Sequence, residues 1–567
     1  MLLLRHWSSR QPLLIHSSRS CFALTTTLLL ASRSLLPSCH ALGMSMSMSM
    51  SRNYQYTSSS SVSRTMLSAI QLTFGTFDDE TLSPTQTQAT VLIGKKEPIQ
   101  KVLSKGHVTG LQDEACLNAL VDSIEGGTGS ATTLLSVAPQ HYHRVTIGLL
   151  PEKVSRNNHP LSVHKITEMV AAACASDNSK ITRLLLVGVS PTCSPAVLTC
   201  AVAKALPLYN RKSQTVSERR VHVAFVDQDS GAVVTPEHCE TVAQAVRMAA
   251  DLVDRTPEEL TTDAYAEEVQ RIVQELVKDG ASVTMTQMVG EELKEKGYGG
   301  LYGVGKAATC PPRFIELNYT PTSPATQKVA LVGKGIVYDT GGLSLKPKEG
   351  MGGMKMDMGG SAGLLGAFYA AVKLQTPVNL TLVLCLAENA IGPKAFRNDD
   401  ILTLYSGKTV EVNNCDAEGR LVLGDGVYHA TKHIDNLDLV VDMATLTGAQ
   451  LVATGKKHAA ILANQEELER RAVAAGLRSG DLCYPILYAP ELLKQEFNSK
   501  VADMKNSVKD RSNAQTSCAG HFIEAHLAED YKGGWIHIDM AGPAWKDDRG
   551  TGYGVGLVLS LLGAPGF

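Results

Sequence analysis

The chain has 567 residues, of which 44% are hydrophobic and 19% are charged, and its formal net charge at pH 7 is −3. This composition is typical of a globular protein with room for two or three domains. No block of basic residues indicates nucleic-acid binding, and no apolar run reaches the length of a membrane span. The 12 cysteines are scattered without a Cys-x-x-Cys pair, which favours reduced thiols over a disulfide framework.

The first 65 residues differ in composition from the rest of the chain. They are rich in serine and leucine, and no acidic residue precedes Asp78. Arginines recur throughout this stretch: Arg5, Arg10, Arg19, Arg33, Arg52 and Arg64. Such a composition resembles an organelle transit peptide, so we expect a mitochondrial or plastid location for a chain whose residues 1–65 lie outside the fold. The apolar run 22–31 could alternatively be the core of a secretory signal, and a start at Met66 would give a cytoplasmic protein.

Residues 66–250 are expected to form a small N-terminal α/β domain. Short apolar, β-branched runs alternate with helical patterns, which is the order of elements typical of this fold class. The predicted strands are 145–150, 182–189 and 222–226, and the predicted helices are 164–175 and 194–205. The histidines of this part are too dispersed to indicate a metal site, so we expect no catalytic residues here.

Residues 255–567 are expected to form a larger α/β domain with a mixed central sheet. A helix predicted over 241–253 leads into it and ends before Pro257. Core strands are predicted at 329–332, 380–386 and 439–443, and helices at 356–373 and 424–432. Ligands on an open α/β sheet gather beyond the carboxyl ends of its strands, so the residues that follow these strands are the candidates for a site.

Two glycine-rich segments of this domain carry an unusual set of charged residues. The first holds Lys334, Asp339, Lys346 and Asp357, and the second holds Asp416, Glu418 and Arg420. Glycines let the backbone approach a ligand closely, and each segment adjoins an apolar run that indicates a buried strand. Carboxylate oxygens collected at strand ends are suitable ligands for a pair of divalent metal ions.

These segments resemble the signature of the leucyl aminopeptidase (cytosol aminopeptidase, M17) family. The stretch from Asn414 reads Asn-Cys-Asp-Ala-Glu-Gly-Arg-Leu, which matches the family motif except that Cys415 stands in place of threonine. The likeness covers roughly the last half of the chain. Within the family, the runs 405–410 and 501–510 resemble most the branch described as probable aminopeptidase-like and found in animals. The resemblance implies a two-metal peptidase that removes N-terminal residues from peptides.

The resemblance also implies roles for the charged residues. Asp339 and Glu418 would bridge the two metals, Asp416 would bind one of them, and Asp357 with Lys334 would bind the other. A lysine binds metal only as the neutral amine, which requires a strongly depressed pKa; the alternative for Lys334 is a salt bridge to Asp339. Zinc and manganese both remain open, although a Cys415 thiolate beside the metals would favour zinc.

Two further residues are implied in catalysis. Lys346 would stabilise the oxyanion that develops on the substrate carbonyl. Arg420 would hold a bicarbonate ion that serves as general base, since a planar guanidinium suits a small planar oxyanion.

Met354, Thr445 and Gly448 match family positions that line the pocket for the first side chain of the substrate. A flexible methionine in an apolar pocket suits leucine-like side chains, whereas simple core packing is the alternative for Met354.

The resemblance implies short peptides as substrates and a homohexamer whose active sites face an interior cavity; no nucleic-acid or membrane partner is expected. One alternative is a catalytically weak or inactive relative that serves as an oligomeric scaffold. Another is a two-metal phosphoesterase, but that class uses histidine-rich ligand sets, and neither segment contains a histidine.

We predict that removal of residues 1–65 leaves peptidase activity unchanged and alters only location, because this stretch lacks acidic residues and a core pattern. A fluorescent protein fused after residue 65 should concentrate in an organelle. Diffuse cytosolic fluorescence would argue against targeting.

Overall fold

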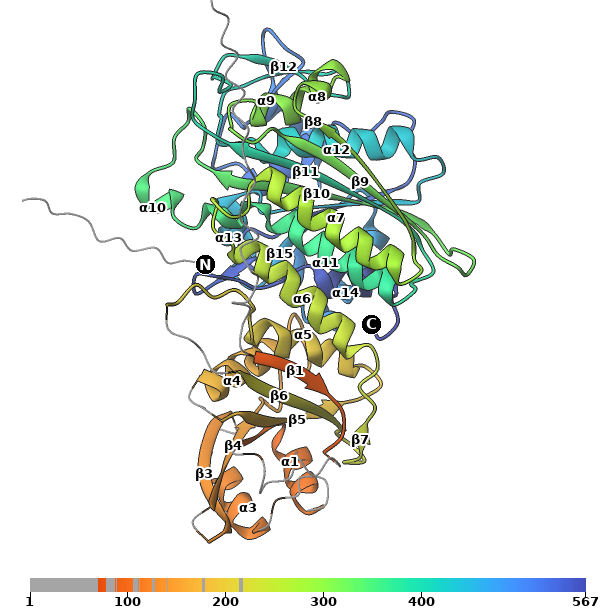
Figure 1. Cartoon of the computed structure of the whole chain (residues 1–567). Coiled ribbons are helices and arrows are strands. Elements are labelled where there is room, and N and C mark those ends of the chain that lie inside the picture. The colour runs from red at the N-terminus through yellow and green to blue at the C-terminus, as the bar shows by residue number, and fades with distance from the viewer. Residues whose placement is uncertain are drawn as a thin grey trace, which may run out of the picture. The chain divides into compact units, whose positions relative to one another are not determined.

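The computed structural model describes residues 70–77, 87, 89–105, 111, 113–124, 128–139, 141–175, 179–213 and 218–567. All of them belong to one compact unit, residues 63–567 (Figure 1). The proposed targeting extension over residues 1–65 lies outside the described residues. Within the described ranges, every helix is too short or too polar to cross a bilayer.

The N-terminal part folds around a mixed sheet with the strand order β1-β6-β5-β2-β4-β3, and β7 pairs with β6. Its strands are β1 (Ile70–Phe74), β2 (Ala89–Gly94), β3 (Gly129–Ala138), β4 (His141–Leu149), β5 (Ile181–Val189), β6 (Arg219–Asp227) and β7 (Val233–Val234). Neighbours from β1 to β4 run parallel, whereas β3 is antiparallel to β4. The helices are α1 (Lys96–Leu103), α3 (Glu114–Asp122), α4 (Val163–Ala175) and α5 (Pro195–Ala205). This alternation confirms the predicted α/β class.

The larger part contains an eight-stranded mixed sheet with the order β16-β15-β18-β14-β10-β11-β9-β8. Its strands are β8 (Ser282–Val289), β9 (Arg313–Thr320), β10 (Lys328–Asp339), β11 (Asn379–Asn389), β14 (Leu439–Ala444), β15 (Ala459–Ala463), β16 (Cys483–Pro485) and β18 (Gly534–Asp539). The central strands β11, β10, β14 and β18 run parallel, while β9 and β15 are antiparallel to their inner neighbours. The mixed sheet is therefore as predicted, with β10 at its centre.

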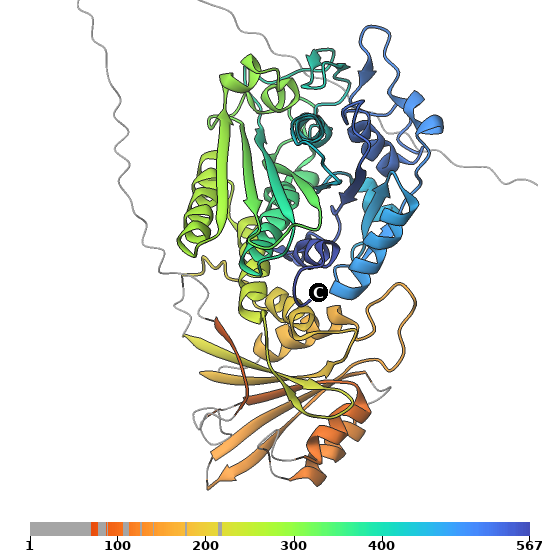
Figure 2. The same ribbon diagram turned by 90° about the vertical axis from the view of Figure 1, so that its right-hand side faces the viewer.

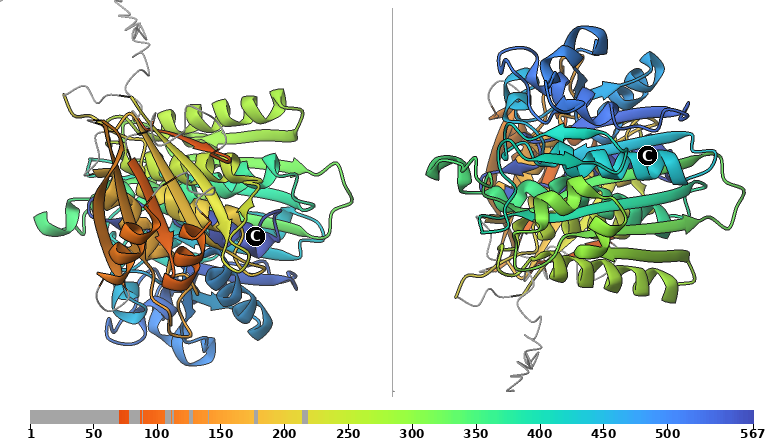
Figure 3. Two further views of the ribbon diagram at one scale, coloured as in Figure 1. Left: turned by 90° about the horizontal axis from the view of Figure 1, so that it is seen from below. Right: turned by 90° about the horizontal axis from the view of Figure 1, so that it is seen from above.

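Both faces of this sheet are buried beneath helices (Figures 2 and 3). Val329 and Leu331 of β10 join the hydrophobic core on one face, and Ala330 and Val332 join the core on the other. Because successive side chains of a strand point to opposite faces, a doubly covered strand is apolar throughout, which explains the continuous runs in the sequence.

One helix layer consists of α6 (Cys239–Asp254), α7 (Thr262–Lys278), α11 (Gly359–Lys373), α14 (Glu466–Ser479) and α17 (Val555–Leu562). The opposite layer includes α9 (Gly299–Gly305), α12 (Gly419–His433) and α16 (Gln515–Glu524). The predicted helix 356–373 is divided, because a 3-10 turn, η3 (Met354–Met358), precedes α11. The division at residues 250–255 between an N-terminal and a catalytic domain stays our proposal.

Glycines bring α11 into direct contact with the sheet beside η3. A β-carbon on Gly360 would lie 2.1 Å from the backbone oxygen of Met443 in β14, and one on Gly333 would lie 2.7 Å from the Cα of Ser361. A real β-carbon cannot occupy either position without backbone movement. These two glycines therefore set the close approach of α11 to β10 and β14.

We predict that Gly360→Ala lowers the free energy of unfolding by about 1–3 kcal/mol, the usual cost of overpacking, even though alanine favours helix. Gly352→Ala is the matched control, because its added methyl group would meet no atom within 4 Å. Chemical denaturation of the two variants measures the difference. Equal stability of the two would contradict the close contact.

Candidate active site

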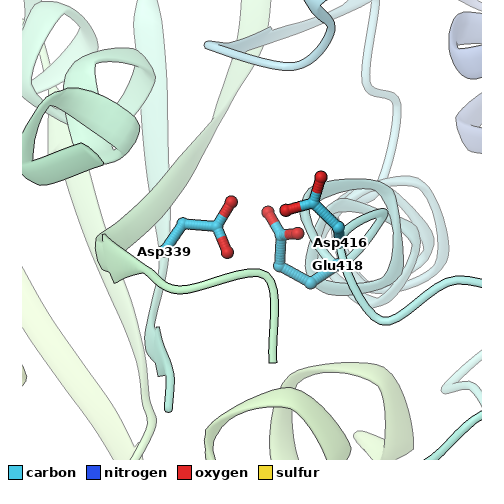
Figure 4. Close-up of side chains that lie close together, drawn as sticks. All are labelled: Asp339, Asp416 and Glu418. Carbon is cyan, nitrogen blue, oxygen red and sulfur yellow. The ribbon is translucent and has the colours of Figure 1, made fainter. Parts of the chain in front are cut away.

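The seven charged residues singled out in the sequence gather around one centre at the carboxyl end of β10, an inner strand of the sheet. Strand β10 supplies Lys334 and Asp339, η3 supplies Asp357, and the loop that leads into α12 supplies Asp416 and Glu418. Asp339, Asp416 and Glu418 each offer an oxygen atom, and these atoms all lie within 4.8 Å of one another. Figure 4 shows the three carboxylates pointing toward a common space.

The position of Lys334 corrects one expectation. The predicted strand ended at Val332, so Lys334 and Asp339 were expected to follow it, but β10 continues to Asp339. The strand can continue because Gly333 and Gly335 leave room for α11 and β11: a β-carbon on Gly335 would lie 2.4 Å from Leu386.

Lys334 is almost completely buried and bridges three segments of the site. Its Nζ lies 2.8 Å from Asp357 and 3.0 Å from Glu418, and it donates to the carbonyl oxygen of Thr445 at 2.9 Å. The ion pairs of Lys334 are thus with these two carboxylates rather than with Asp339. Burial alone would lower the pKa of Lys334, but Asp357 and Glu418 outweigh burial and raise it above its ordinary value.

The position of Lys334 explains why the Asp-Ala-Glu-Gly motif ends in glycine, Gly419. A β-carbon on Gly419 would lie 2.6 Å from Cε of Lys334. Any larger residue would push the lysine out of the centre.

Lys346 approaches the same carboxylates from the loop after β10. Its Nζ lies 2.8 Å from Oδ2 of Asp339 and 2.5 Å from Oδ1 of Asp416. The side chain is 16% exposed, which makes it the more accessible of the two lysines. Burial opposes its charge, but Asp339 and Glu418 outweigh this effect and raise the pKa of Lys346.

Burial raises the pKa values of three of the four carboxylates. Burial, followed by repulsion from Glu418, raises the pKa of Asp339 to about 6. Burial is also the largest cause of the raised pKa values of Asp357 and Asp416. Only the pKa of Glu418 is lowered, because Lys334 and Lys346 together outweigh its burial.

These residues fit divalent cations and a small oxyanion. Oε2 of Glu418, which is 2% exposed, has no hydrogen-bond partner among the described residues. The same is true of Nε and Nη1 of Arg420, which is 3% exposed and whose pKa burial lowers to about 10. A buried polar atom without a partner is costly, so both groups suit a ligand of opposite charge. Hard carboxylate oxygens and one amine form a donor set for two such cations.

The three residues expected to line a substrate pocket lie in different surroundings. Thr445 is buried, and its hydroxyl donates to Oδ1 of Asp357 at 2.9 Å, so it also holds a member of the acidic centre. Gly448 begins α13 (Gly448–Ala453), and a β-carbon there would meet no atom within 4 Å. Met354 begins η3, is half-buried, and belongs to neither hydrophobic core of this part.

Cys415 points away from the carboxylates. Its Sγ lies 3.4 Å from the carbonyl oxygen of Phe396 and 3.3 Å from Oδ1 of Asn398, two acceptors within reach of its single thiol proton. Burial raises the pKa of the Cys415 thiol. The protonated thiol serves packing and hydrogen bonding, so it gives no preference for zinc.

Two buried asparagines of the site, Asn389 and Asn506, were not predicted from the sequence. Asn389 bonds to Asp339, and Asn506 bonds to the backbone on both sides of Asp416. Asn506 lies within the run 501–510, which had been noted only for its family resemblance.

Comparison with known proteins agrees with this geometry. Residues 247–559 match the cytosol aminopeptidase family, catalytic domain, and residues 88–215 match the M17 aminopeptidase N-terminal domain 2. The chain is 46% identical to the probable aminopeptidase NPEPL1 of Mus musculus over 84% of this chain and 90% of that protein. It is 37% identical to leucine aminopeptidase 1 of Caenorhabditis elegans over 83% and 94% of the two chains.

Solved structures show the same fold. Leucyl aminopeptidase from Trypanosoma brucei in complex with bestatin is similar with a TM-score of 0.79 at 38% identity, over 88% of this chain and 95% of that chain. The bottromycin maturation enzyme BotP, solved in complex with Mn, is similar with a TM-score of 0.68 at 26% identity, over 84% and 98%. The chain belongs to the M17 family of aminopeptidases. It is therefore a peptidase, a hydrolase that acts at peptide N-termini.

Proposed function

We propose that the chain is an active two-metal aminopeptidase that removes leucine-like N-terminal residues from short peptides. The observation that carries the proposal is the convergence of four carboxylates and Lys334 on one buried centre. An inactive scaffold is not favoured, because relatives that lose activity usually lose ligands and here all seven charged positions are present. A histidine-rich phosphoesterase site is not favoured either, because the metal-type cluster found among the described residues contains carboxylates alone.

The proposal assigns five residues as ligands of the two metal ions. Asp339 and Glu418 would hold both cations, Asp416 would contribute to one of the two sites, and Asp357 and Lys334 would contribute to the other. When bound, the two cations supply Lewis-acid chemistry: they polarise the scissile carbonyl and lower the pKa of water. They would also lower the pKa of Lys334, which its carboxylate neighbours raise, so that the neutral amine can bind.

Lys346 and Arg420 are the two catalytic residues in this proposal. The charged amine of Lys346 stabilises the oxyanion that develops on the substrate carbonyl. The guanidinium of Arg420 would hold a bicarbonate ion, which would supply a general base, through Nε and Nη1, the two nitrogens without a hydrogen-bond partner in the described part of the chain. Met354, Thr445 and Gly448 would border the pocket for the first side chain of the substrate.

The identity of the metals and the assembly belong to the same proposal. Manganese and zinc both suit the donor set, and BotP provides an example of Mn in a similar fold. We propose a homohexamer with enclosed active sites, which would admit short peptides and exclude folded proteins. We further propose that residues 1–65 direct the protein to a mitochondrion or plastid.

The proposal is tested by activity on a panel of aminoacyl substrates after chelation and reloading with Mn²⁺ or Zn²⁺. Glu418→Gln should abolish hydrolysis while leaving the fold intact, because an amide cannot replace the charge of a carboxylate between two cations. Glu268→Gln is the matched control, since Glu268 is buried but pairs with Arg271 in α7, outside the site. Near-normal turnover by Glu418→Gln with both metals bound would refute the assignment.

A separate prediction concerns Lys346. Lys346→Ala should lower kcat by at least about 10- to 100-fold and change KM much less, because its interaction strengthens as charge develops in the transition state. Lys348→Ala is the control, because it removes an exposed lysine two residues further along, at the start of α10 (Lys348–Met351). Steady-state kinetics decide: a change in KM alone would make Lys346 a ground-state binding residue.

A further inference from the structure

We propose that two buried asparagines, Asn389 and Asn506, are positioning residues that hold the two acidic loops in the geometry that binds divalent metal. The first acidic loop is residues 339–346 and the second is residues 413–418. The inference rests on the proposed metal-dependent function and adds two residues to it.

Asn389 connects the two loops through its side-chain amide. It ends β11, directly opposite Asp339 in the ladder between β10 and β11, and its side chain is fully buried. Its Nδ2 donates to Oδ1 of Asp339 at 2.8 Å and to the carbonyl oxygen of Cys415 at 3.0 Å. Because both partners are acceptors, the orientation of the amide is determined.

This bond decides which oxygen of Asp339 faces the centre. Oδ1 accepts from Asn389 and also from the backbone N–H of Gly341 at 2.8 Å. The other oxygen, Oδ2, lies 2.8 Å from Lys346. With one oxygen held by two N–H donors, the carboxylate presents Oδ2 to a cation in a fixed direction. Hydrogen bonds of this kind commonly set the orientation and affinity of metal ligands.

Asn506 holds the second loop in a similar way. Its Oδ1 accepts from the backbone N–H groups of Asn413 at 2.9 Å and Asn414 at 3.3 Å. Its Nδ2 donates to the carbonyl oxygens of Asn414 at 2.7 Å and Ala417 at 3.2 Å. The amide therefore uses both its acceptor and its donor sites on the backbone that flanks Asp416.

The loops need such restraint because their own residues do little to fix the backbone conformation. Gly341 and Gly342 have φ values of +81° and +57°, a region that glycine enters freely and other residues rarely adopt. The carboxylates on the two loops also repel one another, because oxygen atoms of Asp339, Asp416 and Glu418 all lie within 4.8 Å of one another. The fully buried amide of Asn389 connects the two loops, and the fully buried amide of Asn506 anchors the second loop. Together they counteract both the flexibility and the repulsion.

The test compares Asn389→Ala and Asn506→Ala with Asn464→Ala. Asn464 also makes two hydrogen bonds to backbone, with Gly533 and Trp535, but it lies between β15 and β18 and touches neither acidic loop. Each full-length protein is treated with a chelator, its folding is checked by circular dichroism, and its dissociation constant for Mn²⁺ alone is measured by titration.

Both site variants should fold and bind Mn²⁺ about 10- to 100-fold more weakly, the usual effect of losing a hydrogen-bond partner of a metal ligand. Asn464→Ala should bind Mn²⁺ as the unaltered protein does. Unchanged Mn²⁺ affinity in both site variants would overturn the positioning role alone. Failure of only the site variants to fold would also overturn it, because these asparagines would then determine the fold. Absence of Mn²⁺ binding by the unaltered protein would overturn the proposed metal centre, and this inference with it.

Discussion

The mutual repulsion of four neighbouring carboxylates is the constraint on which the rest of this site depends. Asp339, Asp357 and Glu418 are buried, and Asp416 lies half-buried beside them, so water screens their charges poorly. Lys334, Lys346 and Arg420 provide three positive charges against four negative ones, which leaves the centre one positive charge short if all are ionised. Burial, together with repulsion from the neighbouring carboxylates, raises the pKa values of Asp339, Asp357 and Asp416. Such an arrangement is unfavourable for stability alone and is suited to holding cations.

The fold places these charges together by bringing backbone segments unusually close. Strand β10 lies at the centre of the sheet, and its glycines leave room for α11 and for Leu386 of the neighbouring strand β11. Gly419 leaves space for the Lys334 side chain at the start of α12. The glycines of the two motifs are therefore required by contacts at particular atoms, and the same contacts fix the positions of the ligands.

Much of this could be predicted from the sequence. The α/β class, the mixed sheet and the strands β10, β11 and β14 follow from apolar runs, because doubly covered strands are apolar throughout. The charged site residues follow from the resemblance to the M17 family, and the structure gathers them at one centre. The roles assigned to them individually stay predictions.

Other features could not be predicted because they arise from contacts between distant segments. Whether β10 ends before or after Lys334 depends on the packing of α11, which no local pattern specifies. Asn389, the last residue of β11, and Asn506 carry no local signature, because their hydrogen-bond partners lie on segments distant in the sequence. Cys415 seemed a candidate thiolate until its direction toward Phe396 and Asn398 was known.

The most direct test of the two-metal centre is anomalous X-ray diffraction from crystals of the protein loaded with Mn²⁺. The account predicts two anomalous peaks about 3.5–4 Å apart, both beside Asp339 and Glu418. One should adjoin Asp416, and the other should adjoin Asp357 and Lys334. No peak among these residues, or a single peak with Lys334 still paired to Asp357 and Glu418, would contradict it.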